Sequence, residues 1–306
     1  MRDEHPIPGA DRVVDGVRLH VVRHGTGAGL PLLLLHGFPT SSYLWRDVQR
    51  DLEHHHVTYA PDLQGAGRSE RPAADRYDLA AQARLLLLWM DAIGLQQVAV
   101  AAHDIGGGVA VHLAVQAPER VAALVLVNTA LHSDVWLVPE MAAIAAPVLG
   151  PVQLQALRVV PGLGRRYLRW QIARGLRAEP LTERELAHYA DPLLSAEGAA
   201  GTLRLVRALD PDAVHAALLD LRAAVPPTLV LWGEGDPWHS TAYGRRVAAD
   251  IPGSTYVVVP DAGHFLPEDR PERVAEEISA FLAEIGTPAT AGGAQIVGGA
   301  QPAAGS

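Results

Sequence analysis

The chain has 306 residues, of which 49% are hydrophobic, and a formal net charge of −9. This length allows one large domain with an insertion, and the composition is sufficient for a substantial core. The acidic balance and the lack of a basic run argue against nucleic acid or an anionic membrane surface as a partner. Because the sequence contains no cysteine, disulfides, thiolate chemistry and cysteine-based metal sites are excluded.

The N-terminal sequence, MRDEHPIPGADR, is polar and lacks the apolar segment of a signal peptide. The longest apolar runs, such as LPLLLL and LLLLWM, are too short to cross a bilayer. We therefore expect a soluble, cytoplasmic protein with no membrane partner. The expected partner is an apolar small-molecule substrate. No cofactor or metal is expected, and a homodimer is compatible with the sequence.

Short apolar runs typical of β-strands alternate with helical patterns along the chain. This alternation predicts an α/β protein with a mostly parallel, eight-stranded sheet flanked by helices. The interior strands are unbroken apolar runs, as expected for strands covered on both faces. Clear helical patterns cover residues 79–93 and 271–285. The predicted strands comprise residues 12–15, 17–22, 31–35, 56–60, 97–102, 123–128, 228–232 and 255–259.

The alternation stops after the sixth strand, where helical patterns occur without a convincing strand. Two helix starts lie in this interval: Thr182 and Glu185 fit a capping box, and Ser195 precedes a second helix. We interpret the interval as a helical cap inserted into the α/β core. The C-terminal segment is rich in Gly, Ala and Pro and is predicted to be a disordered tail. The predicted division is 1–130 (core), 131–209 (cap), 210–286 (core) and 287–306 (tail).

The stretch VAVAAHDIGGGVAV, residues 98–111, combines a strand, a short polar turn and the start of a helix. Asp104 lies in this turn between small residues, as does a nucleophile held on a sharp strand-to-helix turn. Backbone N–H groups at the start of the following helix would face the same side chain. The alternative interpretation is that Asp104 only caps the helix, since Asp is a good N-cap residue.

Two further motifs favour a nucleophilic Asp104. Asp236, in LWGEGD, and His264, in DAGH, each follow a predicted strand. The order nucleophile, acid, histidine, with a strand before each, is that of the α/β-hydrolase triad. Glu234 is a weaker candidate for the acid, and Glu268 is expected to cap the next helix.

The segment LHGFP, residues 35–39, ends the first predicted parallel strand. In this arrangement the loop supplies one oxyanion-hole N–H and the residue after the nucleophile supplies the other, which assigns them to Phe38 and Ile105. The Gly-rich turn DLQGAGRS, residues 62–69, lacks the GK[ST] of a phosphate loop and is expected to be structural.

The remaining histidines and tryptophans have simpler interpretations. A metal tract at residues 54–56 lacks an acidic partner pattern. His36 is expected to bond backbone near the oxyanion loop, and His103 to pack beside the nucleophile turn. We expect three tryptophans to pack in the cap or core, and the alternative is that they line the pocket: Trp136, Trp170 and Trp238.

On these motifs, the chain resembles the α/β-hydrolase superfamily over residues 15–285. HGFP and HDIGG are similar to the branch with an aspartate nucleophile, the epoxide hydrolases and haloalkane dehalogenases, and HGFPTSSYLWR is especially similar to a dehalogenase segment. Those dehalogenases usually hold the halide with Asn in the place of Phe38 and Trp in the place of Ile105. Haloacetate dehalogenases carry arginines near the nucleophile, which IGGG here does not offer. The aromatic HGFP instead fits the epoxide hydrolases.

The resemblance to epoxide hydrolases implies a cap tyrosine that donates a proton to the epoxide oxygen. Tyr167 and Tyr189 are the candidates, and Tyr167 is favoured because YLRWQ looks like an epoxide-hydrolase cap segment. The expected activity is opening of an epoxide to a vicinal diol through a covalent aspartyl ester. The alternatives are a haloalkane dehalogenase with a rebuilt halide site, a β-lactone-processing or other biosynthetic enzyme, and an inactive binding protein. The complete set of Asp104, Asp236 and His264 argues against the last.

Overall fold

The computed structural model describes residues 6–72, 76–135 and 138–286. It contains an eight-stranded sheet with the order β1-β2-β4-β3-β5-β6-β7-β8. The pairs β1–β2 and β2–β4 are antiparallel and all others are parallel, which confirms the predicted fold class. The strands are Gly9–Val14 (β1), Val17–His24 (β2), Leu32–Leu35 (β3), Thr58–Pro61 (β4), Val98–His103 (β5), Val121–Val127 (β6), Thr228–Gly233 (β7) and Thr255–Val259 (β8).

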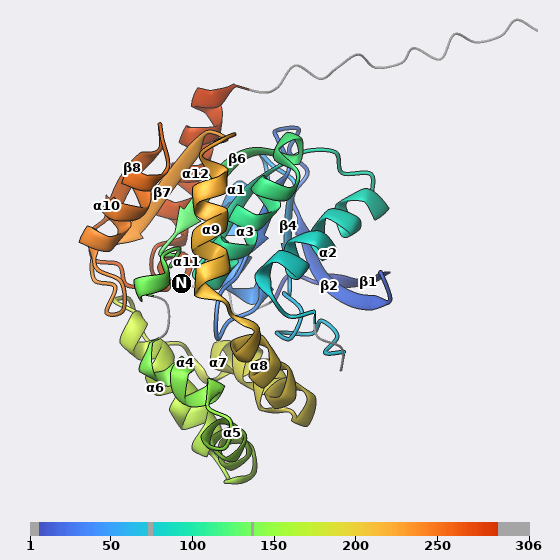
Figure 1. Cartoon of the computed structure of the whole chain (residues 1–306), viewed down its shortest axis with the longest axis vertical. Helices are drawn as coiled ribbons and strands as arrows, with labels where there is room; N and C mark the ends of the chain where they lie inside the picture. Colours follow the sequence, from blue (N-terminus) through green and yellow to red (C-terminus); the bar gives the residue numbers. More distant parts are fainter. Residues whose placement is uncertain (1–5, 73–75, 136–137, 287–306) are drawn as a thin grey trace, which may run out of the picture.

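Helices cover both faces of the sheet (Figure 1). One core cluster joins the sheet to α2, α3, α9 and α10, and a second joins its other face to α1 and α12. Strands β3, β5 and β7 are fully buried, so their unbroken apolar sequences reflect the absence of a solvent-facing side. The core helices are Arg46–Leu52 (α1), Leu79–Ala92 (α2), Ile105–Gln116 (α3), Pro211–Leu221 (α9), Thr241–Asp250 (α10), Leu266–Asp269 (α11) and Pro271–Ile285 (α12).

Most strand boundaries differ from the predicted ones by one to three residues, and in two cases the pairing partners explain the difference. Strand β1 begins at Gly9, which pairs with Val22, three residues before the predicted start. Strand β4 begins at Thr58, the first residue that pairs with both neighbouring strands. His56, predicted as the first residue of that strand, instead bonds the Leu30 carbonyl through Nδ1 at 2.9 Å.

Five helices between β6 and α9 form the cap, which lies below the core in Figure 1. In the described residues 131–135 and 138–209 there is no strand. The capping box of Thr182 and Glu185 is present, and Ser195 caps the next helix, as predicted. Trp136 and the predicted tail, 287–306, lie outside the described residues. The cap helices are Pro139–Ala145 (α4), Leu149–Val159 (α5), Leu163–Gly175 (α6), Glu183–Leu194 (α7) and Ala196–Ala208 (α8).

None of the described helices is long and apolar enough to span a membrane by itself. Helices α4 and α5 together are long and apolar enough, by length and composition only, and the chain bends by 100° at the break between them.

A buried ion cluster joins the cap to the core. Arg46, which is 2% exposed, makes a forked pair with Glu268 (Nη1–Oε1 2.7 Å, Nη2–Oε2 3.0 Å) and reaches Glu185 of α7 at 3.1 Å. Such forked, charge-assisted bonds are geometrically specific. Glu268 was expected to cap a helix; its carboxylate is instead bound to Arg46 and accepts the Tyr189 hydroxyl. Glu268 lies four residues after His264. The ion cluster therefore links the cap to the loop that carries His264.

Candidate active site

Asp104 occupies the turn between β5 and α3 in a strained conformation. Its φ of 52° and ψ of −123° lie where few non-glycine residues are found. A Cβ at Gly37 would lie 2.6 Å from Asp104 Oδ2, and a Cβ at Gly107 would collide with the Thr129 side chain. The small neighbours of the motif are therefore required by close packing, as expected for a nucleophile turn.

The carboxylate of Asp104 is directed away from the helix that follows it. No hydrogen bond from its side chain caps α3. Instead the backbone N–H of Phe38 donates to Asp104 Oδ2 at 2.8 Å. This geometry argues against the helix-cap interpretation and puts the predicted oxyanion-hole donor Phe38 in contact with the carboxylate. Ile105 is the first residue of α3, and its role as the second donor stays a prediction.

The structure brings His264 and Asp236 together. His264 Nδ1 and Asp236 Oδ2 are 2.9 Å apart, and both side chains are buried. The second oxygen of Asp236 accepts the backbone N–H groups of Trp238 at 2.9 Å and His239 at 3.1 Å. Glu234, the weaker candidate for the acid, is exposed. Asp236 is therefore the residue in position to orient the imidazole.

Asn128, at the end of β6, is a site residue that the sequence analysis missed. Its Nδ2 donates to Asp236 Oδ2 at 2.8 Å, and its Oδ1 accepts the Gly233 N–H at 3.0 Å. Asn128 also has a positive φ of 43°. The available signal was a polar residue directly after the apolar run VAALVLV, at the same sheet edge as the triad strands.

The Asp236 carboxylate and the protonated form of His264 stabilise each other. Burial would favour a neutral Asp236, but His264 and the hydrogen bonds from His264 and Asn128 lower the pKa of Asp236 to about 2. Burial would lower the pKa of His264, but the carboxylates of Asp236 and Asp104 outweigh it and raise that pKa above its ordinary value. Asp104 thus lies close enough to His264 to stabilise its protonated form.

A small cavity of about 30 Å³ adjoins Asp104 and His264. Cap residues, among them Gln171 on α6, close it from one side, and the loop after β7 closes it from another. Three of its lining side chains carry buried polar atoms without a hydrogen-bond partner among the described residues: Gln171 Oε1, Trp238 Nε1 and His239 Nδ1. Because buried polar atoms are nearly always paired, these three atoms are exceptions among the side chains beside Asp104 and His264.

Neither candidate proton donor lines this cavity. The Tyr189 hydroxyl donates to Glu268, and burial together with the charge of Glu268 raises the pKa of Tyr189 well above its ordinary value. Tyr167 is half-buried on α6 and packs against Trp170, with ring centroids 5.9 Å apart. Trp170 is half-exposed, whereas Trp238 does line the cavity.

His36 and His103 lie where the sequence analysis placed them, near the oxyanion loop and beside the nucleophile turn. His36 bonds the Gly37 carbonyl through Nδ1 at 2.9 Å and accepts the Leu63 N–H, as predicted for a residue near the oxyanion loop. His103 packs beside the turn, and its Nε2 is 2.9 Å from the His264 carbonyl. Across the described ranges, no group of three or more His, Asp or Glu side chains is arranged to hold a metal ion.

The turn at residues 62–69 is structural, as predicted. The carboxylate of Asp62 accepts the backbone N–H groups of Ser42 and Arg68, each at 2.7 Å. The Ser69 hydroxyl in turn donates to the Asp62 carbonyl at 2.7 Å. These bonds close the turn on itself and on the loop after β3.

Asp104 on a strand-to-helix turn, with Asp236 and His264 on loops at the carboxyl edge of the same sheet, is the arrangement typical of an α/β-hydrolase. The family described as alpha/beta hydrolase fold matches residues 31–271. The chain belongs to this family, in the branch that includes haloalkane dehalogenases and epoxide hydrolases, and it is a hydrolase.

Relatives of known name support this placement. The chain is 32% identical over 273 residues to haloalkane dehalogenase 2 of Mycobacterium tuberculosis, covering 85% of this chain and 90% of the relative. It is 27% identical to a cis-3-alkyl-4-alkyloxetan-2-one decarboxylase of Shewanella oneidensis, with 90% and 88% covered. The crystal structure of Cfl2 from Burkholderia cenocepacia matches with a TM-score of 0.78 and 27% identity, over 90% of this chain and 95% of that one.

Proposed function

We propose that the protein displaces a leaving group from a saturated carbon with Asp104 and then hydrolyses the resulting ester. The observation that carries this proposal is the orientation of Asp104. Its carboxylate faces the Phe38 N–H and the pocket, and does not cap α3. A serine must lose its proton as it attacks, whereas an aspartate is already ionised at neutral pH and attacks without a base.

The two steps use different residues. In the first, an Asp104 oxygen forms a bond to the substrate carbon while the bond to the leaving group breaks and its electron pair leaves. In the second, His264 takes a proton from a water molecule whose oxygen attacks Asp104 Cγ. The Phe38 N–H, with Ile105 as the expected second donor, stabilises the oxyanion. Collapse breaks the bond between Cγ and the ester oxygen. The alkoxide takes the proton from His264, and the alcohol leaves.

A carbon–halogen bond is the better-supported target. A halide leaves as a stable anion, whereas an epoxide oxygen must acquire a proton from an acid. Neither Tyr167 nor Tyr189 lines the cavity beside Asp104. Trp238 does line it, and its buried indole N–H, which has no partner among the described residues, is the candidate donor to a departing halide. The dehalogenase relative of M. tuberculosis supports the same substrate class. Trp238 would then serve in place of the Asn and Trp that dehalogenases usually carry at the positions of Phe38 and Ile105.

Epoxide opening is the second candidate, because the aromatic residue of HGFP fits epoxide hydrolases. A substrate panel separates the candidates: 1-bromobutane, styrene oxide and a p-nitrophenyl ester, followed by bromide, diol and phenol release. We expect bromide release to be the fastest reaction. Release of phenol alone would contradict a mechanism through displacement at saturated carbon.

Replacing Trp238 with Phe should lower bromide release on the order of 100-fold, the usual cost of removing one donor to a developing anion. The substitution keeps an aromatic ring against Phe265 but removes the unpaired N–H. Steady-state kinetics with 1-bromobutane measure the effect. Trp170→Phe is the matched control, since Trp170 is 51% exposed and does not line the cavity. An unchanged rate in Trp238→Phe would show that this N–H does not receive the leaving group.

Replacing Tyr167 or Tyr189 with Phe should leave bromide release within about twofold of the parent protein, because halide departure needs no acid. If styrene oxide is also turned over, diol formation should fall by roughly 10- to 1000-fold in the variant that lacks the acid. Measuring both substrates with each variant separates loss of the acid, which affects only the epoxide, from general damage to the enzyme. A parallel loss of both activities would point to a structural effect, which a melting curve would reveal.

A further inference from the structure

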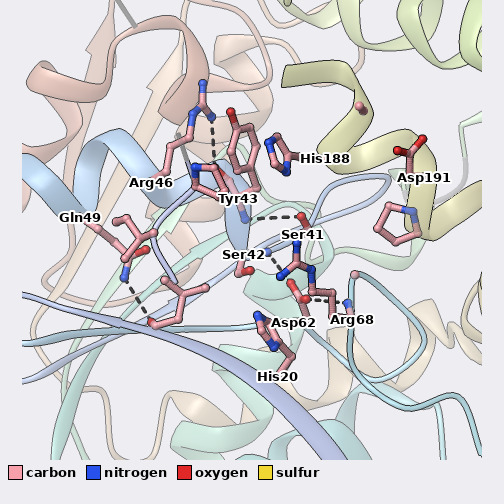
Figure 2. Close-up of a pocket in the computed structure, with 16 residues that line it drawn as sticks. His20, Ser41, Ser42, Tyr43, Arg46, Gln49, Asp62, Arg68, His188 and Asp191 are labelled. Atoms are coloured by element: carbon pink, nitrogen blue, oxygen red, sulfur yellow. Dashed lines mark hydrogen bonds between the residues drawn. The ribbon is translucent and has the colours of Figure 1, made fainter. Parts of the chain in front are cut away.

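A second cavity lies where the cap meets the core. Its volume is about 330 Å³, at the lower end of the range for small-molecule sites. It shares no lining residue with the catalytic cavity. Figure 2 shows the two walls: Ser41, Ser42 and Arg68 on core loops, and His188 on the cap helix α7.

This cavity has hydrogen-bond donors that the fold does not use. Within the described part of the chain, the Arg68 guanidinium has no hydrogen bond or carboxylate partner. Ser42 is 6% exposed, and its hydroxyl is likewise unbonded there. The ring of His188 stacks on Tyr43 with centroids 4.1 Å apart, an arrangement that leaves its nitrogens at the edge free to bond a ligand. An arginine, a hydroxyl and an imidazole thus line one space without protein acceptors.

The acidic and basic groups around this space are already engaged. Asp62 accepts two backbone N–H groups, and Asp191, which also lines the cavity, pairs with Arg165 of the cap. His20 Nδ1 bonds Asp11 at 2.7 Å. Arg46 is bound to Glu268 and Glu185. Two further lining atoms are buried without a partner among the described residues: the donor Arg46 Nε and the acceptor Gln49 Oε1. With the exposed guanidinium of Arg68, the Ser42 hydroxyl and the His188 ring, donors therefore predominate.

His188 and Arg68 both line this cavity, and the charge of Arg68 affects the protonation of His188. Burial, followed by the positive charges of Arg68 and Arg46, lowers the pKa of His188 and favours its neutral ring. A neutral imidazole can donate one hydrogen bond. The full charge is then supplied by Arg68, whose planar fork of N–H groups matches a carboxylate or phosphate.

We propose that this cavity binds the oxyanion of a small organic acid or phosphate compound. Arg68 makes the charged contact, and Ser42 and His188 add neutral hydrogen bonds. Because His188 belongs to the cap and the other two residues to the core, a bound anion bridges them. Binding only to the folded, cap-docked protein raises the melting temperature as the anion concentration rises.

The test uses the full chain and isothermal titration calorimetry, with benzoate and inorganic phosphate as probes and sodium chloride at matched ionic strength as the reference. We expect saturable binding of at least one probe below about 20 mM. Arg68→Gln should weaken it by about tenfold or more, since it removes a charge-assisted fork. Arg166→Gln is the matched control, because Arg166 is an exposed cap arginine outside the cavity.

The two probes distinguish the sources of the oxyanion. Binding of benzoate alone identifies a carboxylate with an apolar body, and binding of phosphate alone identifies a phosphate group. Ser42→Ala serves as a second variant if Arg68→Gln lowers the melting temperature, and it should weaken the same probe by a smaller factor. Absence of saturable binding for both probes, or equal affinity in the parent protein and both variants, would overturn the proposal. The readout requires no substrate turnover, so it is independent of the proposed reaction.

Discussion

Asp104→Asn should lower bromide release on the order of 10⁴-fold or more, as expected when a covalent nucleophile is removed. A carboxamide matches the carboxylate in shape and can still accept the Phe38 N–H, so the turn should persist. What it lacks is the anionic oxygen that attacks carbon. Steady-state halide release measures the loss, and Asp104→Ala excludes recovery by deamidation. Asp15→Asn is the matched control, because Asp15 has a similar φ of 49° in the β1–β2 hairpin, away from the site.

Isotope labelling separates covalent attack from simple base catalysis by Asp104. In one turnover in ¹⁸O-water, the ester route places the label in the Asp104 side chain and leaves the product alcohol unlabelled. If Asp104 instead activated a water molecule, the alcohol would carry the label. The Phe38 N–H at 2.8 Å from the carboxylate favours the ester route, because it would stabilise an oxyanion on Cγ. An unlabelled Asp104 peptide beside a labelled alcohol would refute the covalent mechanism while leaving the fold intact.

His264→Gln should stop the reaction after the first step. Displacement by Asp104 needs no base, but hydrolysis of the ester does. Turnover should therefore fall by about 1000-fold or more while alkylated protein accumulates. Intact-protein mass spectrometry should show an adduct equal to the substrate minus HBr for a bromoalkane, or equal to the whole substrate for an epoxide. His55→Gln, at an exposed position, is the control. Normal turnover in His264→Gln would show that the base lies elsewhere.

The same histidine predicts the pH dependence of the second step. The base must be neutral, and in the ester intermediate, where Asp104 is esterified and uncharged, the carboxylate of Asp236 still raises the pKa of His264. Ester hydrolysis should therefore decline as pH falls through that raised pKa, at a higher pH than an unperturbed imidazole would give. Displacement by Asp104 should not share this decline, so alkylated enzyme should also accumulate in the parent protein at acidic pH. Rapid quenching and mass spectrometry across pH measure both steps.

The strands and the positions of Asp104, Asp236 and His264 could be predicted because their determinants are local. The parallel strands are short apolar runs, and each site residue follows its strand within a few positions, as Asp104 follows β5 and Asp236 follows β7. Parallel strands bring their carboxyl ends to one edge, so the order of motifs was enough to predict that the residues meet.

The missed features depend on contacts that no local pattern contains. Asn128 matters because β6 lies beside β7, which carries Asp236 on its following loop. Glu268 reads as a helix-capping residue in the sequence, and only the fold shows that Arg46 reaches it. The tyrosines illustrate the same difficulty, because the packing of α6 and α7 decides which side chains face the cavity. In this cap, Gln171 lines it and neither Tyr167 nor Tyr189 does.

The ion cluster of Arg46 has a consequence for how this enzyme can change in evolution or in the laboratory. A cap exchanged with that of a relative would bring a new pocket but would remove Glu185 from Arg46 and Tyr189 from Glu268. Removing one partner of a buried ion pair typically costs about 3 to 5 kcal/mol. Here the loss would fall on the loop that carries His264. Grafted caps should therefore need an acidic residue at the position of Glu185 to keep the histidine loop in place.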